Sequence, residues 1–168
     1  MATTVFFDKK FAHFVKTLCE DKNERTNKSV FANNYDLMIF AAMVGKHFNN
    51  DVSDIKIESS SKGIPDRIFK NNNFQGIAYL LALEAEKSAN ILKDNDDNEK
   101  ERWKYFEKYA HLGCEEISTW LADRPQDEPL DIFVDKMKEL AATNIELEKN
   151  ESASNSNESN NNDINFRS

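Results

Sequence analysis

The stretch Asp36-Leu37-Met38-Ile39-Phe40-Ala41-Ala42-Met43-Val44-Gly45 decides the fold of this chain. Its eight consecutive apolar residues, Leu37 to Val44, are too few to cross a bilayer, which takes about 20. A helix that is apolar on nearly every side is typical of an element surrounded by protein. Asn34 or Asp36 is a candidate cap for its start, and Gly45 for its end. The sequence therefore predicts a buried central helix.

A buried strand is the alternative interpretation of the same run. Ala41-Ala42-Met43 favours a helix because Ala and Met have high helix propensity, and only Ile39 and Val44 in the run are β-branched. The chain changes character after Gly45, and we interpret residues 46–51 as a turn.

Four other long segments place apolar residues at steps of three and four, the pattern of an amphipathic helix. They are residues 6–21, 74–92, 101–121 and 130–148, and a shorter helix is expected from Pro65 onward. Leu80 and Leu83 widen the apolar arc of the second segment. Gly113 lies in the apolar stripe of the third, where glycine costs about 1 kcal/mol relative to alanine. We therefore expect Gly113 to allow close approach of another helix, such as the central one.

The predicted fold class is all-α, with one compact multi-helix domain over residues 1–149 around the central helix. One domain of this size suits a chain of 168 residues. Residues 150–168 are rich in Ser and Asn and hold few large apolar residues, so they cannot bury enough surface to offset the entropy of ordering. We predict a disordered C-terminal tail.

Composition and charge narrow the functional classes. The formal net charge of −8 argues against a generally basic nucleic-acid-binding surface. Most of the aromatic residues are Phe, which favours core packing over base stacking. Cys19 and Cys114 lie far apart, so reduced thiols are expected rather than a disulfide framework. Neither a signal peptide nor a transmembrane run is visible, and we expect a cytoplasmic protein without membrane contact.

No catalytic, cofactor-binding or metal site is predicted. The four glycines do not cluster, which excludes a glycine-rich phosphate loop. Residues 94–99 begin like a calcium loop, but Glu99 and Tyr105 stand where that loop needs Gly and Glu. We interpret this acidic segment as a solvated loop between helices.

Two further groups of residues were considered as a zinc site and a nuclease centre, and neither has the residues that such a site needs. His111 and Cys114 are one helical turn apart, but a zinc site needs more ligands, and the remaining candidates are Cys19, His13 and His47. A nuclease centre is superficially suggested by Asp51, Asp54, Glu58 and Lys62, but it needs carboxylates positioned by sheet strands. We therefore expect a protein that is not an enzyme.

Four motifs, most of them apolar, follow one another between residues 34 and 121. They are Tyr35-Asp36-Leu37-Met38-Ile39-Phe40-Ala41-Ala42-Met43-Val44-Gly45, Ile64-Pro65-Asp66-Arg67-Ile68-Phe69, Ile77-Ala78-Tyr79-Leu80-Leu81-Ala82-Leu83 and Phe106-Glu107-Lys108-Tyr109-Ala110-His111-Leu112-Gly113. In order and spacing they resemble the Dnd system-associated protein 4 family, small bacterial proteins encoded beside the genes for DNA phosphorothioate modification and its linked restriction. The resemblance implies a setting in phage defence and carries over no catalytic residues.

From this resemblance we expect an accessory or adaptor protein whose partners are other subunits of such a modification or restriction system. Glu107 and Tyr109 are the motif members that core packing explains least, so they are candidate partner contacts. Glu107 is alternatively a partner of Arg67 or a cap for a loop. The sequence leaves the oligomeric state open.

Two alternatives come from other functional classes. An acidic DNA-mimicking inhibitor of a nuclease or methylase would present its carboxylates along one elongated face. A direct DNA-binding accessory factor would instead gather basic residues on one face despite the net charge. The candidates for that face are Lys22, Arg25, Lys28, Lys46 and Arg67.

Overall fold

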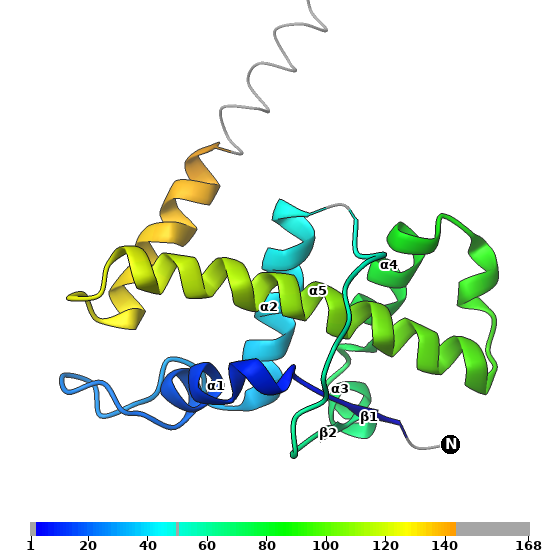
Figure 1. Ribbon diagram of the computed structural model, residues 1–168, viewed down its shortest axis with the longest axis horizontal. Coiled ribbons are helices and arrows are strands. Elements are labelled where there is room, and N and C mark those ends of the chain that lie inside the picture. The colour runs from blue at the N-terminus through cyan, green and yellow to red at the C-terminus, as the bar shows by residue number, and fades with distance from the viewer. Residues whose placement is uncertain (1–2, 50, 144–168) are drawn as a thin grey trace, which may run out of the picture. The chain divides into compact units, whose positions relative to one another are not determined.

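The computed structural model describes residues 3–49 and 51–143 (Figure 1). Its elements are, in order, β1 (Thr4–Val5), the 3-10 helix η1 (Lys9–Phe11), α1 (Ala12–Cys19), α2 (Asn34–Phe48), β2 (Ile64–Pro65), α3 (Asp66–Asn71), α4 (Gln75–Glu86), the 3-10 helix η2 (Ala89–Leu92) and α5 (Asp96–Asp123). Residues 129–143 are also helical. The all-α prediction is confirmed, because most of these elements are helices. The sheet formed by β1 and β2 is small, with two residues in each strand.

The chain divides into two compact units, Met1–Gln126 and a second that begins at Asp127. The boundary predicted at residue 149 stays a prediction, and the predicted tail at residues 150–168 lies outside the described residues. The elements that carry the functional argument all belong to the first unit.

Helix α2 is the central element of the first unit, as predicted. It packs most extensively against α5, which crosses in front of it in Figure 1. The α-helical conformation of Asn34–Phe48 rules out the strand alternative. Its buried face includes Leu37, Met38, Ala41 and Ala42, which are all completely buried. The helix is not buried on every side, however, because Met43 is 51% exposed.

Two glycines allow α2 and α5 to approach each other closely. A Cβ atom on Gly45 would overlap the carbonyl oxygen of Tyr109, and one on Gly113 would overlap the carbonyl oxygen of Ala41. The expectation that Gly113 faces the central helix is therefore confirmed. The prediction that Gly45 ends the helix is wrong. Helix α2 continues to Phe48, through half of the turn expected at residues 46–51, and Asn49 caps it by donating from its N–H to the Gly45 carbonyl.

The predicted helix over residues 6–21 begins later than expected. The 3-10 helix η1 begins at Lys9 and α1 at Ala12. The segment before them is extended, and Thr4 and Val5 pair with β2. Asp8 then caps η1, since its carboxylate accepts a hydrogen bond of 3.0 Å from the backbone N–H of Lys10. This side chain stops a helix from extending toward the N-terminus.

Caps also reset the boundaries of the predicted helices over residues 74–92 and 101–121. Helix α4 ends at Glu86 because Lys87 takes a left-handed conformation with φ of 52°. Helix α5 begins at Asp96, since the side chain of Asn95 accepts from the Asn98 N–H at 2.8 Å. Most of the acidic segment interpreted as a loop is therefore the first turn of α5. Negatively charged side chains in this turn interact favourably with the helix dipole and stabilise the helix.

Candidate functional site

The outer sides of α2 and α4 form an apolar hollow of about 360 Å³. We call it the α2–α4 hollow, and its lining residues are Met43, Lys46, Ile77, Leu80, Leu81, Leu83 and Glu84. Leu80, expected to extend the apolar arc of its helix, is 69% exposed because Ala78, Leu81 and Ala82 form the buried face of α4. Exposed apolar surface that gathers in one place is typical of a contact site.

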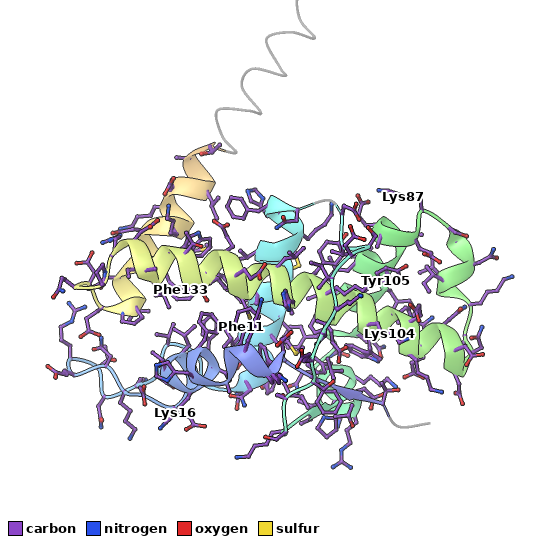
Figure 2. The ribbon with its side chains drawn as sticks, in the orientation of Figure 1. Phe11, Lys16, Lys87, Lys104, Tyr105 and Phe133 are labelled. Carbon is purple, nitrogen blue, oxygen red and sulfur yellow. The ribbon has the colours of Figure 1, made fainter. Side chains whose placement is uncertain are left out.

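Glu84 organises the charged edge of the α2–α4 hollow. Its Oε1 lies 3.2 Å from the Nζ of Lys46 and 2.7 Å from the Nζ of Lys87, which follows the last residue of α4 (Figure 2). Hydrogen bonds from Lys87 and Lys46 lower the pKa of Glu84, so this carboxylate stays charged. The hollow thus combines an apolar floor with a paired, charged edge, an arrangement suited to holding apolar side chains.

The structure separates the basic residues of the DNA-binding alternative. Lys22, Arg25 and Lys28 are exposed together in the loop between α1 and α2. Lys46 lies in the α2–α4 hollow, near the other end of α2, and 15 helical residues span about 22 Å. Arg67 is exposed on α3. One loop therefore carries three of the five candidates, and the other two lie on different elements.

Glu107 is half-buried and Tyr109 is fully buried in the first unit. The Oε1 of Glu107 accepts a hydrogen bond of 2.6 Å from the backbone N–H of Phe6, which is the loop-capping role considered from sequence. Burial raises the pKa of Glu107 to about 7, against the opposing effect of this hydrogen bond. Tyr109 is completely buried. Its hydroxyl has no hydrogen-bond partner among the described residues. Tyr109 is therefore not available at the described surface, and Glu107 is partly exposed with one carboxylate oxygen bonded to Phe6.

Asp8 and His111 form a buried polar pair that sequence reasoning missed. The Nδ1 of His111 lies 3.3 Å from a carboxylate oxygen of Asp8, and its Nε2 lies 3.4 Å from the Oε1 of Glu115. Lys10 reaches the same Glu115 oxygen at 2.6 Å. Since Asp8 and His111 are far apart in the chain, no local signal could have paired them.

The zinc pair of His111 and Cys114, considered from sequence and set aside, does not acquire further ligands among the described residues. Among the described residues, no group of three or more His, Cys, Asp or Glu side chains is placed to hold a metal ion. Cys114 is completely buried, and burial raises the pKa of its thiol far above the usual value, so the thiol stays protonated. A protonated thiol is a poor nucleophile and a poor metal ligand.

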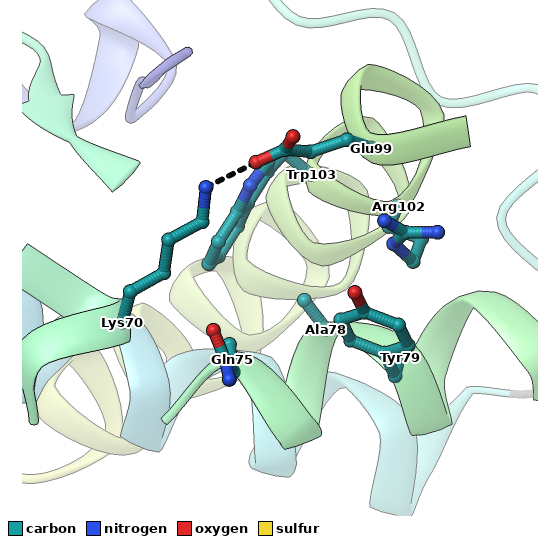
Figure 3. Close-up of a pocket in the computed structure, with 7 residues that line it drawn as sticks. All are labelled: Lys70, Gln75, Ala78, Tyr79, Glu99, Arg102 and Trp103. Carbon is teal, nitrogen blue, oxygen red and sulfur yellow. Dashed lines mark hydrogen bonds and ion pairs between the residues drawn. The ribbon is translucent and has the colours of Figure 1, made fainter. Parts of the chain in front are cut away.

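A small cavity between α3, α4 and α5 holds the buried cation Arg102 (Figure 3). The guanidinium donates to the carbonyls of Ile91 at 2.8 Å and Lys93 at 3.2 Å, and it stacks 4.1 Å from the ring centre of Tyr79. Lys70 reaches Glu99 across the cavity. The cavity volume is about 10 Å³, enough for one water molecule at most. Its charged groups therefore serve packing rather than ligand binding.

Comparison with known protein families identifies the family of the chain. The family described as DNA sulphur modification system-associated protein 4 matches residues 6–155. No curated protein and no solved structure matches the chain. Across the described residues, none of the helices is both long enough and apolar enough to span a membrane.

Proposed function

Because the chain belongs to the DNA sulphur modification system-associated protein 4 family, we propose that it is a non-enzymatic adaptor of that system. It binds other subunits of the modification machinery, or of the linked restriction machinery, through protein contacts and so contributes to defence against phage. The α2–α4 hollow is the observation that carries this proposal. It exposes apolar side chains at the surface of two helices, next to charged groups that are already paired.

The buried residues support a role without catalysis. Cys114 has a protonated thiol, and His111 lies between two carboxylates and an aromatic ring, with the Phe11 ring 5.3 Å from its own. Burial of His111 and Cys114 leaves little of either side chain for a substrate to reach, which supports this part of the proposal. A purified sample that cleaved DNA or nucleotide, and lost that activity on substitution of Glu58 or His111, would overturn the non-enzymatic part of the proposal.

Direct DNA binding is the second candidate function. It is favoured by the three exposed basic residues Lys22, Arg25 and Lys28 in a single loop. Against it stands the net charge of −8, which repels the phosphate backbone. An acidic DNA mimic would bind a basic nuclease or methylase in a manner that weakens steeply with salt.

Tagged full-length protein, purified from a host that carries the modification genes and analysed by mass spectrometry, tests the proposal. We expect subunits of the modification or restriction machinery to co-purify, and to remain bound in 0.5 M salt because apolar contacts dominate. Recovery of nucleic acid alone, with binding lost when Lys22, Arg25 and Lys28 are neutralised, would replace the adaptor with a DNA-binding factor. Complexes that dissociate steeply between low and high salt would support the DNA mimic.

A further inference from the structure

The segment from β1 into η1, residues 4–10, is attached to one face of α5, and we call it the N-terminal strap. Three polar contacts hold it there, and the residues that α5 contributes are four positions apart. The pairs are the Phe6 N–H with Glu107, Asp8 with His111, and Lys10 with Glu115. Two extended residues advance about 6.6 Å and four helical residues about 6.0 Å, so alternate strap residues meet successive turns of the helix.

The other edge of the strap pairs with the segment around β2. Besides the pairing of β1 with β2, the N–H of Lys9 donates to the Glu58 carbonyl at 2.7 Å. The N–H of Ser60 donates to the Phe7 carbonyl at 2.9 Å. Burial of Val5 and Phe7 also favours the closed position. The strap precedes α1, so it can lift from α5 without unwinding any α-helix.

The first contact depends on the protonation of Glu107. Burial raises the pKa of this half-buried side chain to about 7, against the opposing effects of the Phe6 N–H and of the nearby cation Lys104. When the strap lifts, water reaches the carboxylate and its pKa returns toward the ordinary value of 4.5. Between these two values the closed strap holds a proton that the open strap has released. Opening therefore becomes easier as the pH rises through this range.

The second contact changes in the same direction. The Nδ1 of His111 lies 3.3 Å from Asp8 but forms no hydrogen bond among the described residues, so the attraction depends on a protonated imidazole. Its Nε2 lies 3.4 Å from Glu115, whose charge is partly balanced by Lys10. Loss of the imidazole proton as the pH rises removes the attraction to both carboxylates.

We propose that the N-terminal strap is a pH-sensitive element, closed on α5 in mildly acidic solution and opening more readily as the pH rises toward 7. Glu107 and His111, one helical turn apart, act together on it. Opening uncovers their face of α5 and the edge of β2, while the α2–α5 crossing stays intact. The proposal goes beyond the adaptor function and does not depend on it.

Hydrogen exchange followed by NMR on the full-length chain at pH 5, 6 and 7 tests the strap. The reporters are the amides of Lys9 and Ser60, which bond across its edge, and the amides of the α2–α5 crossing are the reference. After correction for intrinsic exchange rates, we expect the opening constant at the reporters to rise at least about tenfold from pH 5 to pH 7. It should also exceed the constant at the reference and stay unchanged in about 1 M urea, because local opening exposes little surface.

Two variants separate the contacts, and circular dichroism checks that each is folded. Glu107→Gln keeps an acceptor for the Phe6 N–H and removes its titration, so the rise with pH should become much smaller. The matched control Glu20→Gln replaces an exposed carboxylate after α1 and should keep the full rise. Lys10→Ala breaks the exposed third contact and should raise the opening constant at the reporters several-fold at each pH.

Three results would overturn the proposal. An opening constant at the reporters that is the same at pH 5 and pH 7 would show that titration does not act on the strap. Reporters that match the reference in opening constant and in urea dependence would show that the strap never opens by itself. An undiminished rise in Glu107→Gln would show that Glu107 is not the group that responds to pH.

Discussion

The carboxylate of Glu107 on α5 accepts a hydrogen bond from the backbone N–H of Phe6, which precedes it by 101 residues. This bond attaches the segment after β1 to the longest helix of the first unit. Burial raises the pKa of Glu107 to about 7, so the carboxylate that forms this attachment gains or loses its proton near neutral pH.

Replacing Glu107 with Gln should flatten the dependence of stability on pH. In the unfolded chain Glu107 titrates near 4.5, and in the folded chain near 7, so the folded state binds more protons between these values. The free energy of unfolding of the unaltered protein should therefore fall as pH rises from 4.5 to 7. Glu107→Gln keeps the acceptor for Phe6 and removes the titration. Thermal unfolding across pH 4–8 measures the slope, and Glu101→Gln on the same helix is the matched control. Parallel curves for the unaltered chain and Glu107→Gln would contradict this assignment.

Gly113→Ala should destabilise the first unit by about 3 kcal/mol, because the added methyl group would force α2 and α5 apart. Gly76→Ala is the matched control, since it makes the same chemical change on α4 where there is open space. Urea denaturation monitored by circular dichroism measures both. Equal stability of the two variants would mean that the crossing is looser than described.

Arg102→Lys should lower the free energy of unfolding by about 2 kcal/mol. A lysine ammonium cannot stack on Tyr79 as a planar guanidinium does while it also donates to the carbonyls of Ile91 and Lys93. Lys104→Ala breaks an exposed ion pair with Glu101 on the same helix and should cost less than about 1 kcal/mol. Denaturant titration of both variants decides, and an Arg102→Lys protein as stable as Lys104→Ala would refute the role given to the guanidinium.

The stability of the Asp8→Asn variant should fall less between pH 7 and pH 2 than the stability of the unaltered protein does. Burial raises the pKa of Asp8, but hydrogen bonds from the backbone N–H groups of Lys10 and Glu58, with attraction to His111 and Lys10, outweigh it and lower the pKa. With the folded pKa below the unfolded value of 3.8, the carboxylate stabilises the fold above about pH 4 and loses that effect as pH falls through the folded value. Unfolding midpoints measured from pH 2 to 7 should fall less steeply for Asp8→Asn. An unchanged steepness would show that other carboxylates control acid unfolding.

Local patterns were sufficient for the central part of the fold. The apolar run from Leu37 to Val44 identified α2, and Gly113 indicated a close helix contact, because both signals are confined to neighbouring residues. The ends of the helices were less predictable, because the side chains of Asn95 and Asp8 cap the first turns of α5 and η1 at positions that the apolar pattern does not indicate.

The partner residues in two contacts between distant segments could not be predicted from the sequence pattern. The Asp8–His111 pair and the Glu107–Phe6 bond depend on where the N-terminal segment lies against α5. Leu80 was assigned to the apolar arc because periodicity gives the direction of a side chain but not whether anything covers it. That residue, 69% exposed, turned out to be the best indication of a contact surface.

The contacts at the α2–α5 crossing are reciprocal. Gly45 faces the carbonyl of Tyr109, and Gly113 faces the carbonyl of Ala41, so each glycine meets the residue four positions before the other glycine. The two helices therefore meet at a single point where each presents a glycine, and sliding either one by a residue would place a Cβ atom where only hydrogen fits. We therefore expect α2 and α5 to stay together when other segments rearrange. Backbone amides at the crossing should exchange with solvent only through global unfolding, and any rearrangement that accompanies binding has to take place in the segments around this pair.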